Sequence, residues 1–111
     1  MPAINLKTSV AFNEETDLLK ELSRSLSVMT GKPESYVMTS IESDVMMTFG
    51  GSTEPCCYVE VKSIGALKPS EMSRDICKLI SSKLQIPENR IYIEFADVQA
   101  KFWGWDGRTF G

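Results

Sequence analysis

The residue with the most distinctive potential chemistry stands second in the chain. A small second residue usually allows removal of the initiator methionine, and Pro2 would then carry a free secondary amine. Such an amine is a base or nucleophile of a kind that no internal residue supplies. The chain contains no histidine, so the most common general base in enzymes is missing. The alternative is that Met-Pro is an ordinary way to begin a chain, and this pair alone leaves both interpretations open.

Thiol and metal chemistry have weaker support. Cys56 and Cys57 are adjacent, Cys77 lies far along the chain, and no Cys-x-x-Cys is present. Adjacent cysteines are poorly placed to bridge each other, and three cysteines do not make a disulfide framework. Without histidine, a zinc site would need all three thiolates plus a carboxylate. We therefore expect no metal and no cofactor, and thiol oxidoreductases are the least favoured class because their paired cysteines have no pair here.

Composition narrows the class of protein. A chain of 111 residues corresponds to one domain, residues 1–111. A net charge of −3 without a basic patch argues against nucleic acid as a partner. No apolar run approaches about 18 residues, which argues against membrane insertion. Asn5, Lys7 and Asn13 would interrupt the apolar region of a signal peptide, so we expect the protein in the cytoplasm.

The first half of the chain predicts a strand, a helix and a second strand. Residues 3–7 alternate in polarity, which is typical of a strand that ends near Thr8 to Val10. Asn13 can cap a helix, and Gly31 and Pro33 can end it. A second strand is predicted over 36–41, and a short third one over 44–49. The buried stripe of the helix is formed by Leu18, Leu19, Leu22, Leu26 and Met29.

The second half repeats this order. We predict a strand over 57–62, a helix with Pro69 at its first position, and a strand over 91–95. A period of two places Tyr92 and Glu94 together on the face of the last strand that Ile91, Ile93 and Phe95 do not occupy. The buried stripe of this helix is formed by Met72, Ile76, Leu79, Ile80 and Leu84.

A shift of about 54 positions aligns the two halves, about 2–50 and 56–104. It places Pro33-Glu34 on Pro87-Glu88 and one predicted strand on the other. A helical crossover makes the strands of each half parallel. The chain therefore predicts an α+β (α/β sandwich) fold: two βαβ repeats form a four-stranded mixed sheet with both helices on one face. The other face has no cover, which favours a homo-oligomer that packs its sheets together.

Several segments occur in an order that resembles the macrophage migration inhibitory factor and D-dopachrome tautomerase family, over the full length from Pro2 to the C-terminus. Each is short, and their ordered combination carries the resemblance. They are Met1-Pro2, Thr30-Gly31-Lys32-Pro33 with Tyr36, residues 49–56, Ser63-Ile64-Gly65, residues 90–93, and Gly104-Trp105 with Thr109-Phe110.

The resemblance implies a tautomerase-superfamily homotrimer with an active site between neighbouring subunits. It implies a keto–enol tautomerase that acts on phenylpyruvate-like aromatic 2-oxo acids or dopachrome derivatives, with Pro2 as the catalytic acid and base. Animal members of the family are also secreted cytokines that leave the cell without a signal peptide. A second hypothesis is therefore a signalling protein that binds a cell-surface receptor and whose pocket chemistry is secondary.

The resemblance also assigns the substrate-binding residues. Lys32 would hold the substrate carboxylate and disfavour protonation of Pro2; the alternative is a solvated lysine near a helix end. Ile64 would contact substrate through its backbone; the alternative is a strand end. Tyr92, Trp105 and Phe110 match pocket walls, which would bury a flat aromatic acid. Their alternative is the core of a trimer, and the two roles are compatible.

The chain departs from the family pattern at three positions. Glu94 also falls among the substrate-binding positions, but it stands where the well-known animal proteins carry asparagine, and an ionised carboxylate cannot donate a hydrogen bond to substrate. Cys56 matches the first cysteine of a vertebrate Cys-x-x-Cys motif, but Val59 occupies the place of the second. Trp103 replaces a smaller residue near the pocket mouth. These departures bear on substrate preference and remove the cysteine pair of the redox interpretation.

Overall fold

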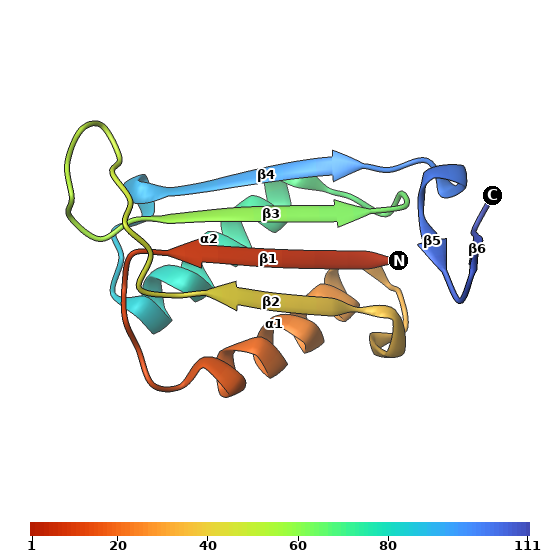
Figure 1. The fold of residues 1–111 in the computed structure, drawn as a ribbon, viewed down its shortest axis with the longest axis horizontal. Coiled ribbons are helices and arrows are strands. Elements are labelled where there is room, and N and C mark those ends of the chain that lie inside the picture. Colours follow the sequence, from red (N-terminus) through yellow and green to blue (C-terminus); the bar gives the residue numbers. More distant parts are fainter.

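A computed structural model describes all residues, 1–111. Four strands form one mixed sheet in the order β2-β1-β3-β4, and two helices cover one face of it (Figure 1). The main elements are β1 (Pro2–Thr8), α1 (Glu15–Thr30), β2 (Met38–Glu42), β3 (Cys57–Ser63), α2 (Pro69–Leu84) and β4 (Ile91–Asp97). β1 pairs in parallel with β2, β3 pairs in parallel with β4, and the two halves join through the antiparallel pair β1–β3. The predicted fold is confirmed.

The internal repeat extends to short elements that the periodicity did not predict. A 3-10 turn, η1 (Glu34–Tyr36), follows Pro33, and its counterpart η2 (Glu88–Arg90) follows Pro87. The two prolines have φ of −58° and −57°. Proline fixes φ and cannot continue a helix, so it redirects the chain from each helix into the following strand. A shift of 54 also places Glu15–Thr30 on Pro69–Leu84.

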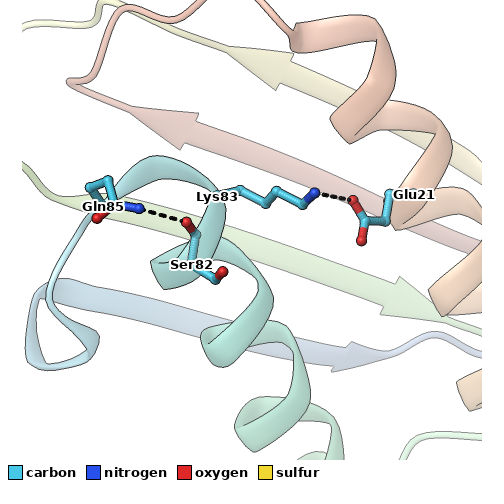
Figure 2. A network of polar contacts seen from close by, with 4 residues as sticks. All are labelled: Glu21, Ser82, Lys83 and Gln85. Carbon is cyan, nitrogen blue, oxygen red and sulfur yellow. Dashed lines mark hydrogen bonds and ion pairs between the residues drawn. The ribbon is translucent and has the colours of Figure 1, made fainter.

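The core lies between the sheet and the helices. The inward positions of β1 and β3, including Leu6, Val59 and Val61, are fully buried, as are Leu22 and Ile80 of the helices. Across the outer surface, Lys83 of α2 pairs with Glu21 of α1 at 3.2 Å, and Gln85 donates a hydrogen bond to the Ser82 carbonyl at 2.9 Å (Figure 2). An exposed ion pair contributes about 0–1 kcal/mol, so apolar burial holds the helices in place. No helix has the length and apolar character needed to cross a membrane.

Three local predictions were wrong. Tyr36 belongs to η1 rather than to a strand, because Pro33 imposes the turn first. Residues 44–49 form no strand, and only a bridge joins Phe49 to Ser52. Asn13 does not cap α1; the N-cap is Glu14, which makes no side-chain capping bond.

The remaining short elements lie after β4. They are the 3-10 turn η3 (Ala100–Phe102) and a hairpin of β5 (Gly104–Trp105) and β6 (Arg108–Thr109). Asp106 and Gly107, with φ of 54° and 75°, form the tight turn of this hairpin. Figure 1 places the hairpin beside the N-terminus, at the end of the sheet where β1 begins and β3 ends.

Candidate active site

A pocket of about 240 Å³ opens at the end of the sheet where β1 begins. Pro2 lies in its wall with a fully buried side chain. Other parts of the wall come from residues 35–38 around η1 and from Trp103, Trp105 and Phe110 of the tail. The pocket therefore depends on three segments that are far apart in the sequence.

The aromatic walls are packed against one another. The rings of Trp105 and Phe110 stack at 5.8 Å between centroids, with an interplanar angle of 13°. Tyr36 meets Trp105 edge-on at 5.7 Å. The β5–β6 hairpin brings Trp105 and Phe110 together, and the Phe110 N–H donates to the Trp103 carbonyl at 3.2 Å. A flat aromatic group would find a matching apolar surface here.

The pairing of β1 with β3 positions Ile64. Pro2 lies opposite Ser63, the last residue of β3, so Ile64 follows at the same end of the sheet. The Lys32 ammonium donates a hydrogen bond to the Ile64 carbonyl at 3.0 Å. Gly31, with φ of 69°, ends α1 and turns the chain so that Lys32 faces this edge. The helix end, the strand end and the chain start thus converge.

The electrostatic setting of the N-terminus suits a base. In this chain the terminal amine belongs to Met1. Partial burial lowers the pKa of that amine, and the positive charge and hydrogen bonding of Lys32 lower it further. An amine with a lowered pKa is neutral over a wider range of pH and can accept a proton there.

The profile of the macrophage migration inhibitory factor family matches residues 1–111 of the chain. The chain belongs to this family. Among curated relatives, the macrophage migration inhibitory factor homologue of Brugia malayi is 37% identical and the protein of Xenopus laevis 36% identical; the alignments cover 100% and 99% of both chains.

Solved structures of the macrophage migration inhibitory factor family share this fold. A homologue from Prochlorococcus marinus superimposes with a TM-score of 0.94 at 55% identity, covering 98% of this chain and 99% of the other. The protein from Trichinella spiralis superimposes with a TM-score of 0.91 at 34% identity, covering 97% and 99%. The tautomerase-type fold that the sequence predicted is therefore confirmed.

The structure gathers some of the predicted site residues and separates others. Pro2, Trp105 and Phe110 line the pocket, and Lys32 and Ile64 meet at the same end of the sheet. A single chain does not bring Tyr92 and Glu94 to them. Tyr92 is the second residue of β4 and lies in register with Tyr58, far from the β3 end at Ser63. Glu94 lies beside Glu60 on the open face.

Sequence reasoning missed part of the pocket wall. Tyr36, Val37 and Met38 contribute to it, although none was assigned to the site. The available signal was the position of Tyr36 just after Pro33, which suits a turn that returns to the sheet edge. Trp103, predicted near the pocket mouth, lies in the wall.

The cysteines have an environment that disfavours thiol chemistry. Cys56 and Cys57 are buried, and none of the three cysteines is in a disulfide. Burial raises the pKa of the Cys57 thiol to about 12, and the neighbouring Cys56 and Cys77 add to the effect. Because the thiolate is the reactive form, Cys57 is poorly suited to redox exchange near neutral pH.

Proposed function

We propose that this protein is a keto–enol tautomerase of aromatic 2-oxo acids in which Pro2 is the acid and base. The observation that carries the proposal is the chain start itself: a partly buried amine lies beside the Lys32 ammonium, and Pro2 lines an aromatic pocket. After removal of Met1, the amine in this environment would be the secondary amine of Pro2. Membership of a family with a tautomerase-type fold supports an isomerase activity.

The reaction needs one proton to change places. The neutral Pro2 nitrogen takes a proton from the carbon next to the carbonyl of the keto acid and then returns this proton to the carbonyl oxygen, which becomes the enol hydroxyl. In the reverse direction, protonated Pro2 returns a proton to that carbon. Positioned proton transfer of this kind typically contributes about 10²–10⁴-fold to the rate. With Met1 in place, the Pro2 nitrogen is an amide and cannot act.

The proposed mode of substrate binding uses the positive charge of Lys32 and the aromatic walls of the pocket. Lys32 would pair with the substrate carboxylate, and its hydrogen bond to Ile64 holds the ammonium at the pocket edge. Trp105 and Phe110, which stack on each other, would form a wall against the aromatic ring of the substrate. The backbone at Ile64 would contact the substrate.

We further propose a homotrimer that completes each site. The open face of the sheet leaves Met38 71% and Tyr92 63% exposed, which is costly for a lone chain. The Pro2 pocket lies at one end of the sheet and Tyr92 at the other. If one end of the sheet contacts the opposite end of the sheet in a neighbouring chain, the chains close into a ring when the rotation between neighbours permits it. Tyr92 and Glu94 of one chain would then reach the Pro2 pocket of the next.

The test is tautomerisation of phenylpyruvate by protein whose intact mass shows that Met1 is absent. Matched controls are the form that retains Met1 and the variant Pro2→Gly, each checked for the same thermal midpoint and the same mass in solution. We expect activity only where a free Pro2 amine exists. Equal activity in all three would exclude the Pro2 mechanism. Inactivity of all three would favour a receptor-binding, cytokine-like role. The location in the cytoplasm and export without a signal peptide remain predictions.

A further inference from the structure

Two segments that carry the family resemblance, residues 49–56 and 90–93, have no part in the mechanism above, and the structure joins them through Arg90. Its guanidinium donates hydrogen bonds to the carbonyls of Phe49 at 3.3 Å, Ser52 at 3.3 Å, Glu54 at 3.0 Å and Pro55 at 2.9 Å. A planar guanidinium with five N–H donors can hold several acceptors in one geometry, which an ammonium cannot do. Arg90 therefore fixes the loop 49–55 against the start of β4.

The loop has a shape that presents Phe49. Phe49 and Ser52 exchange backbone hydrogen bonds of 3.0 and 3.1 Å around Gly50 and Gly51. Both glycines have positive φ, 60° and 77°, so this is a tight turn of the kind that favours glycine at both central positions. Figure 1 shows the loop projecting from the end of the sheet opposite the N-terminus.

The ring of Phe49 lies between a cation and a second ring. The Arg90 guanidinium carbon stands 5.2 Å from the centroid of Phe49, and the ring of Tyr92 lies 4.6 Å away on a tilted plane. Tyr92 is otherwise largely exposed. An exposed tyrosine without such a neighbour would sample several rotamers.

We infer that Arg90 and Phe49 position the Tyr92 ring and so set the preference of the shared pocket for aromatic substrates. This inference rests on the proposed function and on the proposed trimer, in which Tyr92 of one chain lines the Pro2 pocket of the next. We place neither Arg90 nor Phe49 in contact with the substrate. They act through Tyr92 by holding its ring at one orientation, so that an aromatic substrate meets a surface that is already ordered.

The test compares Phe49→Leu and Arg90→Lys with wild type. The first keeps an apolar side chain and removes the ring; the second keeps the charge and removes the planar fork. Ser52→Ala is the matched control, because it removes the hydroxyl that accepts from the Glu54 N–H in the same loop without changing either ring. An aromatic pair contributes enough to predict a rise of about three- to tenfold in KM for phenylpyruvate in Phe49→Leu, with kcat nearly unchanged. KM for an aliphatic 2-oxo acid should stay the same.

A second readout does not depend on activity. The three tyrosines can be replaced by 3-fluorotyrosine and the Tyr92 resonance assigned with Tyr92→Phe. We expect Phe49→Leu and Arg90→Lys, but not Ser52→Ala, to shift this resonance toward the position of an exposed tyrosine. An unchanged resonance in folded, wild-type-sized Phe49→Leu would overturn the inference, as would equal changes in KM for aromatic and aliphatic substrates. Absence of activity in wild type would count against the proposed function, while the resonance would still decide whether Tyr92 is held.

Discussion

Replacement of Lys32 by glutamine should separate two effects of one charge. The ammonium donates to the Ile64 carbonyl at 3.0 Å and lowers the pKa of the adjacent terminal amine, after the larger effect of burial. It is also the only cation found at this amine. Lys32→Gln removes the charge and leaves a polar side chain that is one atom shorter.

The expected rise in KM follows from the loss of the charge-assisted hydrogen bond between the Lys32 ammonium and the substrate carboxylate. A hydrogen bond to a charged group contributes about 1.5–3 kcal/mol, which corresponds to about 10- to 150-fold in KM. The effect on pH has a definite sign. The neutral amine is the active base, so the rate rises as pH increases through its pKa. Removal of Lys32 raises that pKa, and the acid limb of the pH profile should therefore move to higher pH.

The assay is steady-state tautomerisation of phenylpyruvate over a range of pH, on protein without Met1. Lys20→Gln is the matched control, because Lys20 is an exposed lysine on the same helix and its loss changes the net charge equally. The control should retain the wild-type KM and pH profile. If Lys32→Gln also retained both while folding normally, Lys32 would be a surface lysine and the reasoning would be refuted.

Two further predictions follow from other groups. Glu94→Gln should lower KM for an anionic 2-oxo acid by about fivefold, because removal of one like charge at contact distance is worth about 1 kcal/mol in water; an unchanged KM would place Glu94 outside the completed site. Cys57 should resist alkylation by iodoacetamide at pH 8 in the native protein, because its pKa of about 12 leaves almost no thiolate. Rapid modification, located by mass spectrometry, would contradict the burial of this thiol.

The sequence by itself determined the order and kind of the main elements. Period and end signals are local properties: Leu18, Leu22 and Leu26 recur at helical spacing, Gly31 favours a left-handed stop, and Pro69 suits a first helical turn. The repeat then fixed the topology, because a strand, a helix and a strand of these lengths must form a parallel crossover. The proposal that Pro2 is the catalytic base could also be made from the sequence, because the chemistry of this residue depends on its position at the start of the chain.

The tertiary structure alone decided which distant groups meet. Lys32 and Ile64 lie far apart in the chain, and they meet because the register of β1 with β3 places Pro2 opposite Ser63. Local periodicity carries no information about such pairings. The same holds for Arg90, which looks like an ordinary turn arginine until the fold brings four loop carbonyls within its reach. It also holds for Tyr92, whose place at the far end of the sheet follows from strand register and makes an assembly of chains necessary for the complete site proposed above.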